Sequence, residues 1–253
     1  MSKVVLSLVV TLLVLTALSS LASAQTKCET TLSGGAGNFA YNYCVSHDST
    51  IVHMETPLTF QHLSTTAPSE GYGFCDLDTN TAYYDYADGG ASSNWGNSVV
   101  LAQQPNLLVI SRPTSDGLWD LTETFTTSTA DSSIAIKMEL TNEDQSKKSK
   151  RVNLVRFANV NVNGSASNLF QVTPFSVVAG ATGVGSPGIQ LRDAGKAANT
   201  PIGLTKPSGP DPCNPTANSK APFFTSDGAE ELLYVRTIPK NESRTATVLY
   251  RPF

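Results

Sequence analysis

Strict alternation of apolar and polar residues in one short segment constrains the fold more than any other feature of this chain. Within residues 134–140, four apolar residues occupy every second position, and the charged Lys137 and Glu139 stand between them. Side chains alternate between the two faces of a β-strand, so the pattern predicts a strand with one buried and one solvated face. An antiparallel sheet of such strands has to bury its apolar face against a second layer, which predicts a β-sandwich.

Residues 151–162 form a second apolar-rich run, and a polar, charged connection separates them from the first strand. We therefore expect residues 132–141 and 151–162 to form one antiparallel hairpin. The rest of the chain consists of short alternating runs with turn signals between them, and it lacks a long segment with the 3.6-residue period of a helix. The sequence predicts an all-β, antiparallel β-sandwich of about twelve strands, with little or no helix outside an N-terminal signal peptide.

The first 24 residues have the three parts of a secretory signal peptide: Lys3 in a short basic head, an apolar run over residues 4–18, and the small-residue site Ala22-Ser23-Ala24. The apolar run is shorter than the roughly 20 residues of a membrane span. Its removal leaves residues 25–253, which contain no second apolar run of membrane length. We expect a secreted or periplasmic chain that folds as one β-sandwich domain, with an irregular proline-rich segment at residues 187–222.

The charge balance argues against a nucleic-acid partner. The chain carries 17 Lys and Arg residues against 21 Asp and Glu residues. An acidic balance favours solubility and disfavours binding to phosphates. The one basic cluster, at residues 147–151, is best explained as a solvated turn.

Four cysteines in an exported chain predict two disulfides. Sequence alone leaves three connectivities open. We expect Cys28 to pair with Cys44, which closes a short glycine-rich loop, and Cys75 to pair with Cys213, which pins the proline-rich segment to the body of the protein. Metal binding by these thiols is not expected, because the chain has no Cys-x-x-Cys pair.

Asp76, Asp78 and Asn80 stand at alternate positions, like the first three ligands of a calcium loop. The glycine and the glutamate that an EF-hand requires further along are missing. Two interpretations stay open: an irregular calcium site closed by Asp85 or Asp88, and a turn between two strands that the Asp and Asn side chains cap. An extended strand after the turn carries Asp88 about 20 Å away, so the turn is favoured and no cofactor is expected.

Aromatic side chains gather after this turn. Tyr84, Tyr86 and Trp95 have the composition of a stacking platform for sugar rings, and Asp85 and Asp88 could accept hydrogen bonds from hydroxyl groups. Trp95 stands in a polar loop without apolar neighbours, which predicts that it is exposed. The platform is therefore the predicted ligand-binding surface.

Residues 98–127 alternate regularly, and Asp116-Gly117 lies between two of their runs. Asp-Gly between alternating segments predicts a hairpin turn. In the run that follows, Trp119 shares a face with Leu121 and Phe125, so we expect Trp119 in the core.

The sequence contains no complete motif of the enzyme classes considered. The chain contains no Gly-x-Ser-x-Gly elbow and no His-Glu-x-x-His pair. Gly183, Gly185 and Gly188 match Gly-x-Gly-x-x-Gly, but Pro187 and the absence of a following helix exclude a dinucleotide site. His53 and His62 lack the spacing of a zinc site and are expected to be surface residues of a strand.

The strands and Asn-rich turn at residues 134–164 loosely resemble the large secreted β-sandwiches that accompany carbohydrate-active enzymes. Three function classes follow. The leading hypothesis is a non-catalytic exported module that binds glycan or another surface ligand through Tyr84, Tyr86 and Trp95. The second is a structural or surface protein without a small ligand. The third is a carbohydrate-active enzyme in which two carboxylates, such as Asp76 and Asp85, act as acid and base about 5 to 10 Å apart.

Overall fold

The computed structural model describes residues 26–66, 68–146, 148–165, 167–173, 176–181, 187–195, 202–205, 207–215, 223–226 and 228–253. This part of the chain contains eighteen strands and two 3-10 turns, η1 (Gly37–Phe39) and η2 (Val162–Gly164). All strand pairs are antiparallel, which confirms the predicted all-β sandwich, although the strands outnumber the expected twelve. The predicted signal peptide, Gly183 and Gly185 lie outside the described residues.

The strands form three sheets. The nine-stranded sheet contains, in spatial order, β16 (Phe223–Ser226), β12 (Asn168–Thr173), β13 (Ser176–Ala181), β14 (Gly188–Asp193), β18 (Ser243–Pro252), β10 (Ile134–Asn142), β9 (Trp119–Thr127), β8 (Leu107–Pro113) and β7 (Val99–Gln104). The six-stranded sheet contains β15 (Ile202–Thr205), β17 (Ala229–Ile238), β11 (Lys150–Asn159), β4 (Glu70–Asp76), β5 (Thr81–Tyr86) and β6 (Gly90–Ala91). The three-stranded sheet contains β1 (Thr30–Gly34), β2 (Tyr41–Val45) and β3 (Ile51–Glu55).

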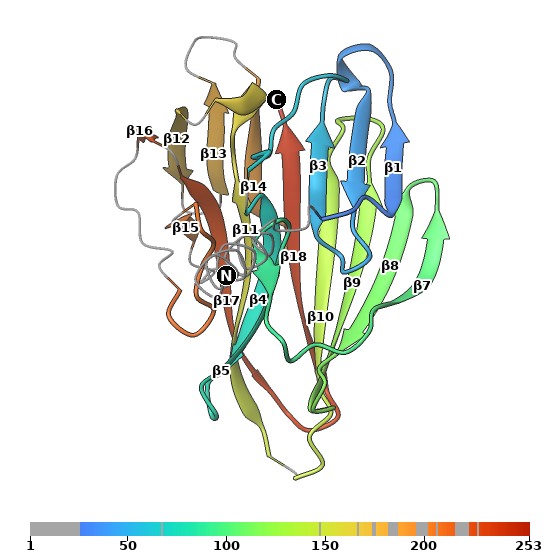
Figure 1. Cartoon of the computed structure of the whole chain (residues 1–253), viewed down its shortest axis with the longest axis vertical. Coiled ribbons are helices and arrows are strands. Elements are labelled where there is room, and N and C mark those ends of the chain that lie inside the picture. The colour runs from blue at the N-terminus through green and yellow to red at the C-terminus, as the bar shows by residue number, and fades with distance from the viewer. Residues whose placement is uncertain are drawn as a thin grey trace, which may run out of the picture.

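The two smaller sheets together form the second layer of the sandwich. Figure 1 shows β1, β2 and β3 over the β8–β10 part of the nine-stranded sheet, and β4, β11 and β17 beside them over the remainder. Hydrogen bonds join the layers: the Tyr41 hydroxyl donates to Thr127 at 2.9 Å, and the Tyr43 hydroxyl donates to the carbonyl of Ser132. The nine-stranded sheet therefore serves as the common base of the fold.

The alternation seen in the sequence places the core. The four apolar residues of β10 are fully buried and the residues between them are not. Trp119 is 0% exposed on the neighbouring β9, as predicted. Its ring meets Phe74 of the opposite layer edge to face at 5.5 Å, so the aromatic core couples the two layers.

The predicted hairpin between residues 132–141 and 151–162 is wrong. β10 pairs with β9 and β18, whereas β11 pairs with β17 and β4 in the other layer. The connection between the two strands crosses from layer to layer, and the Asn142 amide fixes the crossing by donating to the carbonyls of Lys148 and Ile238. The alternation of a strand indicates which face is buried but carries no information about its partner.

The Asp-Gly hairpin is confirmed. β8 and β9 pair up to the Pro113–Asp120 position, and Gly117 has a φ of 69° in the turn between them. Asp116 stabilises this turn by accepting from the Leu118 backbone N–H at 3.0 Å.

Both predicted disulfides are present, Cys28–Cys44 and Cys75–Cys213. The second anchors residues 207–215 on the outer face of the six-stranded sheet. The Tyr86 hydroxyl donates to the carbonyl of Pro210 there, and Phe157 is fully buried beneath the segment. The outer face of this sheet is consequently covered, which explains why nearly every residue of β11 is buried.

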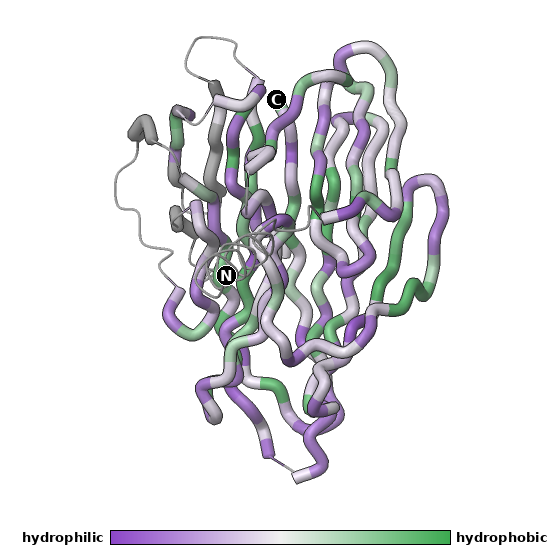
Figure 2. The backbone as a smooth tube through the Cα atoms, in the orientation of Figure 1, coloured by the Kyte–Doolittle hydropathy of each residue, from purple (hydrophilic) through white to green (hydrophobic). Residues whose placement is uncertain are grey.

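One edge of the nine-stranded sheet is open and apolar. Val99 and Leu101 on β7 are 53% and 59% exposed, and Figure 2 shows hydrophobic segments on β7 and β8 at this edge. A β-bulge between Val100 and Ala102 interrupts the ladder, a feature that discourages further strand pairing. No helix in the part of the chain that the structure describes is long and apolar enough to cross a membrane.

Candidate functional site

A cluster of charged side chains lies between the layers, where a sandwich core is ordinarily apolar. Arg156 of β11 is fully buried and donates to Glu70 of β4 through Nε–Oε1 at 2.5 Å and Nη2–Oε2 at 3.0 Å. Its Nη1 donates to Glu123 of β9 in the opposite layer. The Tyr250 hydroxyl donates to Glu70 at 2.8 Å, and the Ser49 hydroxyl donates to Glu123. This ion triad therefore joins the two layers.

The triad has one cation for two carboxylates. Burial raises the pKa of Glu123 to about 7, and the attraction of Arg156 offsets this only in part. Glu123 is 1% exposed and Glu70 is 0% exposed, so a substrate cannot reach either group. The triad therefore affects the stability of the fold. Groups that react with a substrate have to lie nearer the surface.

The charged network continues outward through Tyr72 and Arg112. The Arg156 guanidinium lies 5.7 Å from the centre of the Tyr72 ring, and Arg112 Nη1 donates to the Tyr72 hydroxyl at 3.1 Å. Arg112 also pairs with Asp85 of β5 through Nη1 and with Asp48 through Nη2 at 3.4 Å. One guanidinium therefore holds two carboxylates from different parts of the chain.

Asp48 and Asp85 open on a cavity of 420 Å³, which we call the carboxylate cleft. Asp48 comes from the turn between β2 and β3, and Asp85 comes from β5. Glu29, His47 and Asp88 line the same cavity. The volume lies within the range of roughly 300 to 1,000 Å³ that is usual for small-molecule sites.

The two carboxylates have unlike surroundings. The Asp85 side chain is 11% exposed, and burial raises its pKa above the usual value against the opposing effect of Arg112. The Asp48 side chain is 41% exposed and accepts a hydrogen bond from the Ser98 hydroxyl at 2.5 Å. Because both carboxylates contact the same guanidinium, they lie within about 10 Å of each other, the range of acid and base pairs in sugar chemistry. Environments that separate two carboxylates in this way suit one to donate a proton and the other to accept it.

Trp95 is not exposed, contrary to the prediction. It is 9% exposed, and its indole N–H donates to the carbonyl of Tyr84 at 3.0 Å. Its ring meets Tyr72, Phe74 and Tyr83 edge to face, and the Arg112 guanidinium lies 5.0 Å from its centre. The polar loop folds back on β5 and inserts its single large residue into the core.

Tyr84 and Tyr86 lie on the other face of the same sheet. Their rings stack at 4.9 Å, and they line a cavity of 450 Å³ together with residues 208–212. Tyr86 is only 6% exposed. The tyrosines and Trp95 are therefore separated by the backbone of β5 and do not form one stacking surface.

Asp76 is committed to an ion pair. It is 0% exposed and its Oδ2 accepts from the Lys150 ammonium at 2.9 Å. Its Oδ1 accepts from the backbone N–H of Asp78 at 3.0 Å, and Asn80 has a φ of 54°, so the segment is the capped turn that the sequence favoured. Within the described residues, no group of three or more His, Cys, Asp or Glu side chains is arranged to hold a metal ion.

Asp76 is also not the partner of Asp85. Tyr72 stands opposite Asp85 in the β4–β5 ladder, and Asp76 lies further along β4 opposite Thr81. Four residues of strand separate the two carboxylates by about 13 Å, which exceeds the range for a glycosidase pair. The second carboxylate near Asp85 is therefore Asp48, and not Asp76 as the sequence predicted.

The sequence interpretation missed Asp48 and Arg112. Asp48 has no local signal, because it reaches Asp85 only through the tertiary fold. Arg112 does have one: it shares a strand face with Leu108 and Ile110, and a charged residue on an apolar face predicts a buried ion pair.

His62 also departs from expectation. It is fully buried rather than on the surface, and its Nε2 bonds to the carbonyl of Thr56 at 2.7 Å. Burial lowers the pKa of His62 to about 4, so the ring is neutral at physiological pH.

The sequence matches no family model and no curated protein. Solved structures do share its fold. A putative aldose 1-epimerase from Escherichia coli K12 is 10% identical, matches 88% of this chain and 99% of its own, and has a TM-score of 0.50. A galactose mutarotase-like protein from Lactobacillus casei ATCC 334 is 11% identical over 88% of this chain and 100% of its own, with a TM-score of 0.52. A bacterial glucoamylase solved with acarbose is 10% identical over 90% of this chain but only 33% of its own, with a TM-score of 0.54.

The fold is therefore a galactose mutarotase-like β-sandwich. This finding corrects the leading prediction from the sequence, a non-catalytic exported module. The chains that share the fold over nearly their whole length are described as an aldose 1-epimerase and a galactose mutarotase-like protein.

Proposed function

We propose that this protein is a carbohydrate-active enzyme that transfers protons at the anomeric centre of a sugar, in the manner of an aldose 1-epimerase. The observation that carries the proposal is the pair of carboxylates, Asp48 and Asp85, held by Arg112 at a cavity of 420 Å³. The shared fold of the epimerase and mutarotase-like proteins supports it.

Interconversion of anomers needs one acid and one base. The base removes the proton from the hydroxyl on C1 while the acid donates a proton to the ring oxygen, and the bond between C1 and the ring oxygen breaks. The open-chain aldehyde rotates about its C1–C2 bond, and the reverse transfers close the ring on the other face. We assign the acid to Asp85, the more buried of the two carboxylates, whose pKa is raised by burial against the opposing effect of Arg112. Asp48, the more exposed carboxylate, is the base.

Arg112 is a positioning residue in this scheme. It contacts both carboxylates, and the Tyr72 hydroxyl below it accepts its hydrogen bond and donates to the carbonyl of Asp48 at 2.9 Å. The pair is thereby oriented before a substrate enters, which lowers the cost of reaching the reactive geometry. Asp88 also lines the cleft, and we assign it to a contact with a sugar hydroxyl group.

The two disulfides support export to an oxidising compartment, secreted or periplasmic. This agrees with the signal peptide expected from the sequence.

Polarimetry of freshly dissolved aldoses tests the function. Catalysed mutarotation of at least one aldose is expected from the wild type, and Asp85→Asn and Asp48→Asn should each lower kcat by about 10²- to 10⁴-fold. Asp78→Asn is the matched control, because Asp78 is exposed in the turn after β4 and lines neither side of the cleft. Rates equal to the buffer blank with glucose, galactose, mannose and xylose, and also with the reducing disaccharides maltose, cellobiose and lactose, would refute the proposed function. Full activity in both cleft variants would refute the assignment of acid and base.

A further inference from the structure

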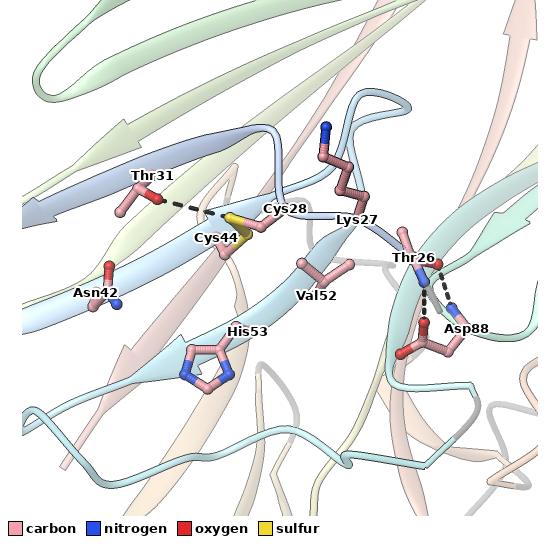
Figure 3. A pocket seen from close by; sticks show the side chains of 9 residues that line it. All are labelled: Thr26, Lys27, Cys28, Thr31, Asn42, Cys44, Val52, His53 and Asp88. Carbon is pink, nitrogen blue, oxygen red and sulfur yellow. Dashed lines mark hydrogen bonds between the residues drawn. A yellow bond between two sulfur atoms is a disulfide. The ribbon is translucent and has the colours of Figure 1, made fainter. Parts of the chain in front are cut away.

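A second cavity of 490 Å³ adjoins the carboxylate cleft (Figure 3). Thr26, Lys27 and Asp88 line both cavities, so the two are neighbours, and residues 26–27 lie between them. In Figure 3, Asn42 lies at one end of this outer cavity, and Thr26 with Asp88 lies at the other.

The dividing wall is fixed from both sides. The Asp88 backbone N–H donates to the Thr26 hydroxyl at 2.7 Å, and the Thr26 N–H donates to the Asp88 carboxylate at 2.5 Å. Beyond Lys27, the Cys28–Cys44 disulfide and a bond from the Glu29 N–H to the carbonyl of Val45 at 3.0 Å tie the segment to β2. The two cavities therefore keep a constant relation to each other.

His53 presents a ring of fixed orientation to the outer cavity. Gln61 Oε1 accepts from the Met54 backbone N–H at 2.9 Å, which leaves its amide nitrogen to donate to His53 Nδ1 at 2.7 Å. His53 Nε2 then carries the proton and pairs with Glu55 at 3.0 Å. Both ring nitrogens are thereby engaged within the protein, and the ring remains part of the cavity lining.

The remaining lining suits a neutral sugar ring. The Asn42 amide, the Thr31 hydroxyl and the Asp88 carboxylate supply donors and acceptors for hydroxyl groups, and the ring of His53 with the side chain of Val52 supplies an apolar surface. Lys27 also lines the cavity, and polar groups beside an apolar surface are what a sugar site requires.

We propose that the outer cavity is a second sugar subsite, which makes the substrate a reducing disaccharide or a longer oligosaccharide. The reducing-end ring occupies the carboxylate cleft and the next ring occupies the outer cavity, with Asp88 between them. This inference rests on the proposed function for the identity of the first subsite.

Isothermal titration calorimetry tests the subsite without relying on activity. Maltose, cellobiose and lactose are compared with glucose and galactose. At least one disaccharide should bind about tenfold more tightly than its component sugars. Asn42→Ala and His53→Ala should remove that advantage and leave monosaccharide affinity unchanged. Asn38→Ala is the control, because Asn38 is exposed on η1 and lines neither cavity.

The outcomes separate this inference from the proposed function. Catalysed mutarotation with equal affinity for monosaccharides and disaccharides would overturn the subsite and leave the function intact. Tighter disaccharide binding that depends on Asn42 and His53, without mutarotation, would support the subsite and overturn the function. If His53→Ala fails to fold, His53→Phe keeps a ring at the position and should retain the disaccharide advantage. Loss of that advantage in a folded His53→Phe protein would count against stacking.

Discussion

Replacing Glu123 with glutamine should change how the stability of the protein depends on pH. Glu123 is buried beside Arg156, and its pKa rises from 4.5 to about 7 on folding. Between these values the folded state binds more protons than the unfolded state, so the free energy of unfolding falls as the pH rises. Each pKa unit corresponds to 1.36 kcal/mol, which makes the loss about 3 kcal/mol over this range.

His62 acts in the opposite direction. Its pKa falls from 6.5 to about 4 on folding, so the folded state binds fewer protons between these values and the free energy of unfolding rises with pH. Burial also raises the pKa of Glu230, which lowers the free energy of unfolding as the pH rises in the wild type and in the variant alike. The difference between the two proteins therefore isolates Glu123: the wild type should lose about 3 kcal/mol more than Glu123→Gln between pH 4.5 and 7.

Urea unfolding followed by tryptophan fluorescence at pH 5, 6, 7 and 8 measures both curves. Glu139→Gln is the control, because Glu139 lies on β10 with its side chain 35% exposed and pairs with Lys137 at the surface. Its curve should run parallel to that of the wild type. A constant difference between Glu123→Gln and the wild type at all four pH values would refute the assignment of a proton to Glu123 near neutrality.

Three further results are expected. Arg156→Met removes the only cation of the triad and leaves the buried Glu70 and Glu123 carboxylates without a positive charge beside them, which should lower the free energy of unfolding by about 3 to 5 kcal/mol in denaturant titration; a loss below 1 kcal/mol would contradict this. Trp119→Ala should cost about 3 to 5 kcal/mol in the same assay, because the ring is fully buried between the layers. Millimolar calcium should leave the melting temperature unchanged, since Asp76 is paired with Lys150, and an upward shift reversed by chelator would show that a metal site had been overlooked.

Much of the fold follows from local patterns. The alternation of β9 and β10 indicates their buried faces, Asp116-Gly117 marks the hairpin between β8 and β9, and the even number of cysteines predicts two bridges. Strand partners do not follow, because the alternation of β10 is equally compatible with β11 and with β18 as a neighbour. The crossing at Asn142 decides between the two neighbours. The side-chain amide of Asn142 donates a hydrogen bond to the carbonyl of Ile238, which is far away in the sequence.

The carboxylate cleft was also hard to predict, because its residues come from segments that are far apart in the sequence. Asp85 and Asp88 were recognised because they stand in one segment rich in functional groups. Asp48 and Arg112 come from distant segments, and only the packing of β3, β5 and β8 brings them to Asp85. The prediction that Trp95 is exposed was wrong, because a polar loop can fold back and bury its one large side chain.

Charged residues on otherwise apolar strand faces carry information about strand partners. Glu123 shares its face with Trp119 and Phe125, and Arg156 shares its face with Leu154. A buried charge requires a partner of opposite sign, so two such residues on different strands predict a contact between those strands. Applied to this chain, that rule would have placed β9 and β11 in facing layers.

If the carboxylate cleft transfers protons at the anomeric carbon of a sugar, the protein accelerates the exchange between anomers even at equilibrium. Magnetisation transfer between the α and β signals of a 1-¹³C-labelled aldose, drawn from the sugars that the wild type accepts in polarimetry, measures the rate without a change in concentration. Exchange should be faster with the wild type than in buffer, and close to the buffer rate with Asp85→Asn. Exchange that is unaffected by the wild-type protein, or equally fast with Asp85→Asn, would contradict this.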